Sequence, residues 1–124
     1  MPFRDAFPIL NTRDLDRLAS FYCDALGFER GYRFPAEGPT AFLVVTLGEL
    51  SIGLAQTPER DEVGRTALWL YTDDVDAEVR RLWDAHGAAV ADGPADRAWG
   101  ERLASVRDPD GNLLHIGSRG EGSS

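Results

Sequence analysis

The segment PILNTRDLDRLASFYCDALGF at positions 8–28 returns sixty residues later as LWLYTDDVDAEVRRLWDAHGA at positions 68–88. The two copies align without a gap. The identical pairs are Leu10/Leu70, Thr12/Thr72, Asp14/Asp74, Asp16/Asp76, Asp24/Asp84, Ala25/Ala85 and Gly27/Gly87. A repeat of this kind indicates two copies of one structural unit.

Each copy reads as a strand followed by a helix. An apolar run gives way to an aspartate suited to capping a helix, Asp14 or Asp74, and a glycine follows where the helix should stop. The apolar residues of the helices recur at amphipathic spacing, so each helix should bury one face. These residues are Leu15, Leu18, Ala19, Tyr22, Ala25 and Leu26 in the first helix, and Val75, Val79, Leu82, Trp83 and His86 in the second.

Three strand-like runs follow each helix, which makes both halves βαβββ and the fold class α+β. The runs are 32–34, 40–47 and 50–56 in the first half, and 88–90, 102–107 and 112–117 in the second. We expect one domain over 1–124, with module 1 at 5–56, a linker at 57–65, module 2 at 66–118 and a disordered tail at 119–124.

Composition narrows the class of protein. The 124 residues include 43% hydrophobic ones, no run is long enough for a membrane span, and the first ten residues carry a charged pair where a signal peptide is apolar. Cys23 is the single cysteine, which fits a reducing cytoplasm and excludes a cysteine-built zinc site. The net charge of -8 disfavours nucleic acid as a partner and suits a cationic small molecule. The alternative is that the charge only maintains solubility.

Three stretches together resemble one known family. They are RDLDRLASFYCDALGF at 13–28, DDVDA at 73–77 and AWGERLASVRDPDGNLLHIG at 98–117. With the repeat, they resemble the vicinal oxygen chelate superfamily of glyoxalases, dioxygenases and bleomycin-resistance proteins, and are most similar to the last. The resemblance implies two βαβββ modules whose curled mixed sheets surround a cavity with the helices outside, and it implies a homodimer.

Metal enzymes of this superfamily place ligands on the first and last strand of each module. The repeat puts those positions at Phe7, Ala67 and His115, and matching Gly48 to Gly111 puts the fourth at Ile52. Three of the four side chains have no donor atom, whereas a stable site needs about three protein ligands. We therefore expect no bound metal and no cofactor.

Strand side chains alternate, so residues two positions from these sites should face the cavity. The predicted ligand-binding residues are Phe7, Ile9, Asn11, Ile52, Trp69, Tyr71, Trp99, Leu113 and His115. Trp99 could instead hold its loop down, and His115 could be a core histidine satisfied by a carbonyl. No nucleophile and base are discernible, since nothing in the sequence places Thr46, Ser51 or Ser105 within reach of His115.

The function expected from these residues is binding without catalysis. A protein of the bleomycin-resistance type would sequester an aromatic, cationic antibiotic between aromatic plates in an acidic surround. Two alternatives stay open. One is a vicinal oxygen chelate enzyme on a small substrate, with a metal held by other residues or with His115 as general base. The other is a binding module for a different ligand, because one fold serves many functions.

Overall fold

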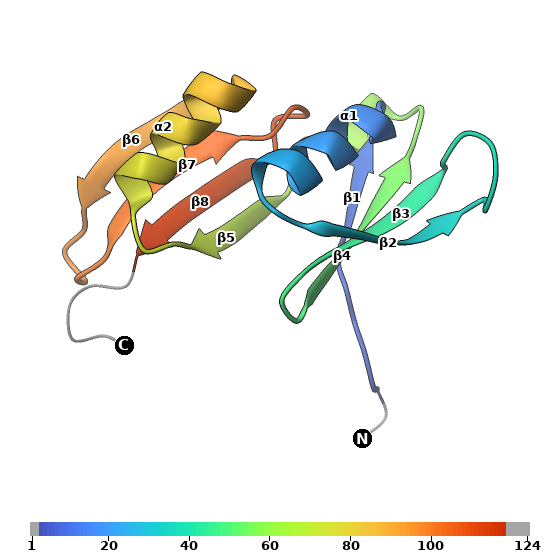
Figure 1. The fold of residues 1–124 in the computed structure, drawn as a ribbon, viewed down its shortest axis with the longest axis horizontal. Coiled ribbons are helices and arrows are strands. Elements are labelled where there is room, and N and C mark those ends of the chain that lie inside the picture. The colour runs from blue at the N-terminus through green and yellow to red at the C-terminus, as the bar shows by residue number, and fades with distance from the viewer. Residues whose placement is uncertain (1–2, 119–124) are drawn as a thin grey trace. The chain divides into compact units, whose positions relative to one another are not determined.

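A computed structural model describes residues 3–118 and so leaves the tail predicted at 119–124 outside the described residues. The chain divides into two compact units between Gly64 and Arg65. Each unit has the element order βαβββ and a four-stranded mixed sheet with a helix against one side (Figure 1). The prediction of an α+β fold built from two such modules is confirmed. Within residues 3–118 no helix has the length and apolar composition needed to cross a bilayer.

Unit 1 contains the first copy of the repeat. Its elements are β1 (Ile9–Thr12), α1 (Leu15–Ser20), which runs on as a π-helical turn (Phe21–Ala25), β2 (Glu29–Phe34), β3 (Phe42–Leu47) and β4 (Leu50–Gln56). The strand order is β1-β4-β3-β2, with β1 parallel to β4 and the other pairs antiparallel. A short 3₁₀ helix (Arg60–Glu62) lies in the segment expected as the linker.

Unit 2 repeats this plan with a longer helix. Its elements are β5 (Ala67–Tyr71), α2 (Val75–His86), β6 (Ala89–Asp96), β7 (Arg102–Arg107) and β8 (Leu113–Ser118). The strand order is β5-β8-β7-β6, again with the first and last strands of the unit parallel. The repeat alignment therefore holds from element order through to strand pairing.

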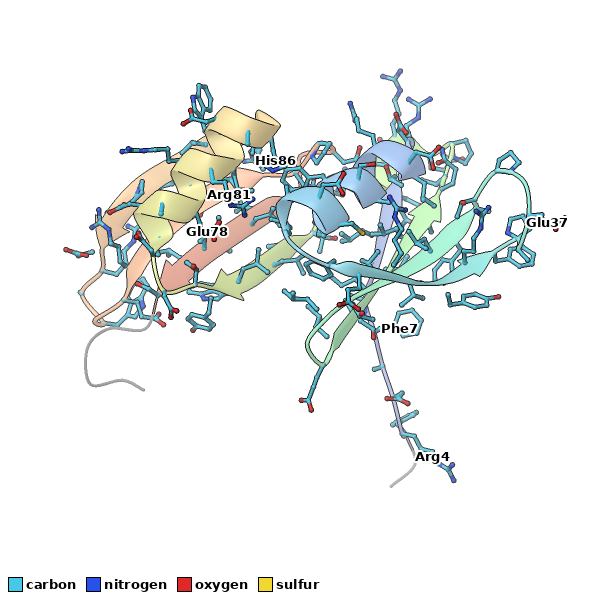
Figure 2. All side chains as sticks on the ribbon, in the orientation of Figure 1. Arg4, Phe7, Glu37, Glu78, Arg81 and His86 are labelled. Atoms are coloured by element: carbon cyan, nitrogen blue, oxygen red, sulfur yellow. The ribbon has the colours of Figure 1, made fainter. Side chains whose placement is uncertain are left out.

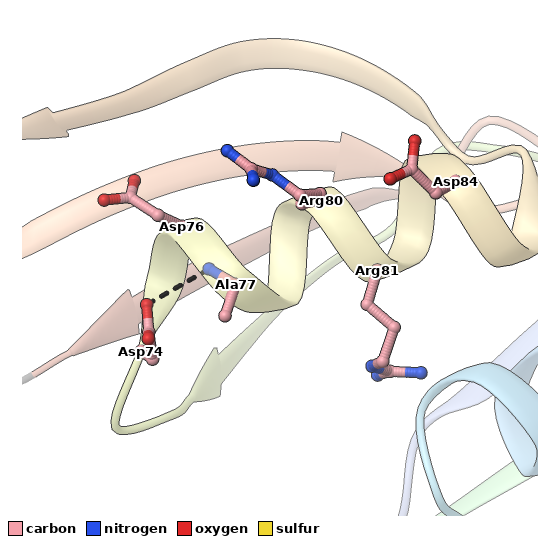
Figure 3. A pocket seen from close by; sticks show the side chains of 6 residues that line it. All are labelled: Asp74, Asp76, Ala77, Arg80, Arg81 and Asp84. Carbon is pink, nitrogen blue, oxygen red and sulfur yellow. Dashed lines mark hydrogen bonds between the residues drawn. The ribbon is translucent and has the colours of Figure 1, made fainter.

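Both helices begin at the predicted aspartates. The carboxylate of Asp14 accepts from the backbone N–H of Arg17 at 3.1 Å, and that of Asp74 accepts from Ala77 at 3.1 Å (Figure 3). The φ angles of the two aspartates are −144° and −142°, both extended. A side-chain oxygen bonded to the N3 amide satisfies one of the donors that a helix start leaves free.

Both helices also end at the predicted glycines. Gly27 and Gly87 have φ of 84° and 65°, in the left-handed region where only glycine avoids a steric penalty. The next residues, Phe28 and Ala88, each donate to the carbonyl six residues earlier at 3.0 Å. The paired glycines thus stand in equivalent environments, as the alignment requires.

The core lies between each helix and the sheet face it covers, here called the helix face. Buried side chains of the helix face include Leu10, Leu43, Val45, Ile52 and Leu54 in unit 1, and Ala104, Val106, Leu114 and Ile116 in unit 2. They pack under helix residues that include Leu15, Leu18, Val75, Val79 and Leu82. Because hydrophobic burial scales with apolar area, these two small cores supply most of the stability of their units.

The predicted placement of Ile52 is wrong. Strand β4 pairs Gly53 with Ile9 and Ile52 with Val45, so Ile52 shares the fully buried helix face with Val45 and Leu54. The glycine alignment matched Ile52 to His115, whereas the strand pairings Ile9–Gly53 and Trp69–His115 match Gly53 to it. A shift of one residue sends every side chain of a strand to the opposite face. Gly53 is therefore the true counterpart of His115.

The expectation that Trp83 is buried is also wrong. Its side chain is 58% exposed, whereas Val75, Val79 and Leu82 are buried. The apolar stripe of α2 is narrower than the spacing suggested, and Trp83 lies beside it over a surface groove that Val90 of β6 also lines.

Truncating Trp83 should therefore cost little in this chain. We expect Trp83→Ala to lower the free energy of unfolding by less than about 1 kcal/mol, and its buried neighbour Leu82→Ala to lower it by roughly 2–5 kcal/mol. Urea unfolding followed by circular dichroism measures both. Equal losses in the two variants would show that Trp83 is covered in solution.

The turn between β7 and β8 is held by a buried polar pair. Asp108 accepts from the backbone N–H groups of Asp110 and Asn112 at 2.9 Å, and the Asn112 amide donates to it at 2.8 Å. The Asn112 carbonyl oxygen accepts from the N–H of Thr66, just before β5, at 3.0 Å. Asp108 and Asn112 are 5% and 1% exposed. Buried polar groups satisfied in this way fix the turn and tie it to β5.

Removing one partner should destabilise unit 2 strongly. Asn112→Ala deletes two buried hydrogen bonds, and we expect a loss of about 2–3 kcal/mol in the free energy of unfolding. Asp84→Ala on the exposed side of α2 is the control and should change stability by no more than about 0.5 kcal/mol. A chemical denaturation series compares them, and a loss below about 1 kcal/mol for Asn112→Ala would contradict the role assigned to the pair.

Candidate functional site

The face of each sheet opposite its helix is here called the open face. In unit 2, strand pairing brings Trp69, His115 and Ser105 into one row across β5, β8 and β7. Tyr71 lies in the next row, beside Gly117. These positions alternate with the buried residues of the helix face, so the open face carries the sequence-predicted residues of β5 and β8 together.

Three rings form an aromatic cluster on this face: Trp69, Tyr71 and His115. The ring centroid of Trp69 is 5.4 Å from that of His115 and 6.2 Å from that of Tyr71, with tilted planes. Trp69 and Tyr71 are 43% and 49% exposed, so the cluster presents ring surface instead of filling the core. Exposed aromatic surface on a sheet is suited to contact with a planar apolar partner.

Gly117 provides the space in which the Trp69 indole lies. A Cβ added at Gly117 would stand 3.2 Å from Nε1 of Trp69 and 3.6 Å from two of its ring carbons. The backbone of Gly117 does not need glycine for its φ angle, since its φ is not positive. The glycine is therefore explained by the close approach of the ring.

His115 is anchored by a serine. Its Nδ1 lies 2.9 Å from Oγ of Ser105, the residue directly opposite it on β7. Ser105 is 6% exposed and His115 is half-buried. Sequence reasoning missed this contact, although counting outward from the 108–112 turn would have paired the two positions.

Trp99 stands in the turn between β6 and β7. Its ring is 62% exposed and its Nε1 donates to Glu101 at 2.6 Å, so the contact that holds it is local. An exposed ring does not anchor the loop to the core, and that alternative is not supported. The turn joins β7 at the end where Leu103 pairs with Gly117, which is also the Tyr71 end of the sheet.

Unit 1 has a smaller aromatic group on its own open face. Phe7 precedes β1 on the side of the sheet away from α1 (Figure 2), and its ring and that of Phe42 both lie close to Gly53. A Cβ at Gly53 would meet Phe42 at 2.8 Å and Phe7 at 3.2 Å, and the Tyr32 ring lies 6.5 Å from that of Phe42. Phe42 and Tyr32 were not predicted as site residues. The alternation of Phe42 with buried Leu43 was the available signal.

The remaining predicted residues are spread along the open faces. Ile9 is exposed on β1, and Asn11 is half-buried and forms a backbone bridge with Val63. Leu113 pairs with Ala67 at the end of β8 away from Gly117. Their role in binding stays a prediction.

The residues at the four family metal positions do not fit a metal. With Gly53 in place of Ile52, the positions hold Phe7, Gly53, Ala67 and His115, and only the histidine has a donor atom. Within residues 3–118 no group of three or more His, Cys, Asp or Glu side chains is placed to hold a metal ion. Burial raises the pKa of the Cys23 thiol, which disfavours the reactive thiolate.

A shallow hollow follows the exposed side of α2 (Figure 3). Its lining mixes Asp74, Asp76 and Asp84 with Arg80 and Arg81. Charges of both signs in open water interact weakly and are easily screened, so this hollow has no feature of a ligand site.

A comparison with protein-family profiles matches residues 6–116 to the Glyoxalase/Bleomycin resistance protein/Dioxygenase superfamily. The chain belongs to this superfamily. The family membership agrees with the two βαβββ units. The comparison with curated proteins gave no match.

Several solved structures of the superfamily fold resemble the chain over nearly its whole length. TnmS3, an antibiotic binding protein from Streptomyces sp. CB03234, is 30% identical with a TM-score of 0.77, covering 96% of this chain and 98% of its own. TioX from Micromonospora sp. ML1 is 24% identical with a TM-score of 0.77, covering 94% and 99%. A lactoylglutathione lyase from Agrobacterium tumefaciens is 22% identical with a TM-score of 0.69, covering 94% and 95%. The last two likenesses show the fold alone.

Gly117→Ala tests whether the glycine positions Trp69. The added Cβ should push the indole off the strand and change the near-ultraviolet circular dichroism of the folded protein, with a stability change of no more than about 1 kcal/mol because the exposed ring can move. Gly93→Ala in β6 is the matched control, since a Cβ there meets nothing within 4 Å. An unchanged near-ultraviolet spectrum in Gly117→Ala would contradict the proposal that Gly117 provides the space for the Trp69 indole.

Proposed function

We propose that this protein captures an aromatic, cationic antibiotic without chemical conversion. The observation that carries the proposal is the exposed cluster of Trp69, Tyr71 and His115 on the open face of unit 2. The likeness to TnmS3, an antibiotic binding protein that is 30% identical to this chain, supports an antibiotic as the ligand. Three of the four family metal positions lack donor atoms, which favours binding over metal-dependent catalysis.

Capture of this kind needs only surface complementarity. A planar ring that stacks on Trp69 and Tyr71 removes apolar area from water on both partners, and aromatic pairs add roughly 0.5–1.5 kcal/mol beyond that burial. Trp99 belongs to the same end of the sheet and would supply a further plate. Positive charge on the ligand would be favoured by the net charge of -8, which raises the rate of encounter.

The proposal includes the rest of the predicted wall and the state of the protein. Leu113 would contribute apolar surface on the open face of unit 2, and Phe7, Ile9 and Asn11 would contribute apolar surface and one amide on that of unit 1. The protein would work as a homodimer in the cytoplasm, which the family resemblance and the single cysteine support. Native mass spectrometry with elemental analysis reports subunit number, metal content and any retained ligand in one experiment. One divalent metal per chain would contradict the proposal of metal-free capture.

The aromatic plates are tested by truncation. We expect Trp69→Ala and Trp99→Ala each to weaken binding of a bleomycin-type glycopeptide by roughly 1–3 kcal/mol, because each variant loses a stacking surface. Isothermal titration calorimetry is suitable, since its signal does not depend on the tryptophans themselves. Both variants should keep the thermal midpoint of the wild type within a few degrees.

Trp83→Ala serves as the matched control for this series. Trp83 is a comparably exposed tryptophan of unit 2, but it lies on α2, and α2 covers the helix face. Its removal should therefore leave the affinity unchanged. An equal loss in all three variants would indicate a general disturbance instead of a site. Failure of the wild type to bind would remove this class of antibiotic from the proposal.

A further inference from the structure

Ser105 and His115 form a part-buried side-chain hydrogen bond on the open face of unit 2, and stacking of a ring on Trp69 does not itself require this bond. Oγ of Ser105 and Nδ1 of His115 are 2.9 Å apart, and no other hydrogen bond is formed by either side chain among residues 3–118. The two residues are direct partners on β7 and β8, so the sheet register imposes their contact. His115 in turn touches the Trp69 ring.

The direction of this hydrogen bond follows from the chemistry of the two groups. Ser105 is 6% exposed, and a buried hydroxyl proton requires an acceptor. Nδ1 of His115 is the acceptor that Ser105 has within reach, so the hydroxyl donates and Nδ1 accepts. A neutral imidazole whose Nδ1 accepts carries its proton on Nε2. Nε2 lies on the opposite side of the ring and has no partner among the described residues.

A nucleophilic role for Ser105 fits less well. A serine nucleophile must reach the substrate while histidine takes its proton, whereas Ser105 is only 6% exposed and lies beside the more exposed His115 on the neighbouring strand. The contact instead suits a histidine that acts as a fixed hydrogen-bond donor, because the serine sets the tautomer and the ring orientation of the histidine.

We propose that Ser105 is a positioning residue that holds His115 with its Nε2–H as a hydrogen-bond donor beside the Trp69 ring. The site then favours ligands that stack on Trp69 and carry a hydrogen-bond acceptor at the edge of their ring system. A carbonyl or ether oxygen would serve as this acceptor. This inference rests on the proposed function, since it specifies the chemistry of the captured aromatic molecule. A site with one fixed polar group discriminates by leaving that group unpaired when the wrong ligand binds.

The tautomer is measured directly by ¹⁵N NMR of the imidazole nitrogens. The chain has two histidines, and His86→Gln assigns their signals. We expect His115 in the wild type to carry its proton on Nε2, with Nδ1 shifted as an acceptor. Ser105→Ala should convert His115 to a mixture of tautomers, Ser105→Thr should restore the wild-type pattern, and His86 should not change. A proton on Nδ1 in the wild type, or no change in Ser105→Ala, overturns the assignment.

Selectivity is measured with two probes that differ by one carbonyl group, 9-fluorenone and fluorene. We expect the wild type to prefer fluorenone by roughly three- to tenfold, the range for one neutral hydrogen bond. Ser105→Ala should lose most of this preference while its affinity for fluorene stays within about twofold, and Ser105→Thr should regain it. His115→Phe keeps a ring and should abolish the preference. Circular dichroism and thermal melting of each variant check that it folds.

The possible failures separate the two proposals. If neither probe binds the wild type, aromatic capture on this face is contradicted, and the acceptor rule fails with it. If both probes bind equally while NMR shows the Nε2 proton, capture stands and the acceptor rule is overturned. If fluorenone is preferred and Ser105→Ala keeps that preference, the donor exists but Ser105 does not position it.

Discussion

The buried Asp108–Asn112 pair decides which residues of unit 2 reach the open face. It fixes a five-residue turn between β7 and β8, and the turn sets the register in which Ser105 meets His115 and Leu103 meets Gly117. Because strand side chains alternate, a turn longer or shorter by one residue on either strand would exchange His115 with a core residue. The stacking cluster, the space above Gly117 and the donor at Nε2 all depend on this one length.

The corresponding turn of unit 1 shows what sequence can and cannot predict. Element order, helix caps and glycine stops depend on local signals, and the repeat made them visible in both copies at once. The face of β4 depends on register. The β3–β4 turn is two residues long and β4 is seven residues against six in β8, so aligning glycines misplaced Ile52 by one position. Pairing strands outward from each turn, as for Ser105 and His115, would have avoided the error.

For the candidate site, the sequence predicted which strands carry the aromatic residues but not how their side chains pack. Alternation was enough to group Trp69, Tyr71 and His115, because it is a property of any strand. The roles of Gly53 and Gly117 depend on where the rings of other residues lie in space, and no local pattern carries that information. Trp83 fits a helical apolar stripe by spacing, yet the width of a buried stripe is set by the sheet beneath it.

Two strands at the sheet edges, β2 and β6, have a further consequence for the life of this protein in a crowded cell. Exposed edges invite other chains to add a strand, which is a common start of aggregation. Register shifts interrupt the pairing of both strands, β2 carries several charged residues, and β6 contains Pro94, which has no N–H to offer. The β2 edge of unit 1 and the β6 edge of unit 2 thus present backbone that resists the addition of a strand from another chain, which lowers the tendency of the folded protein to aggregate through these edges.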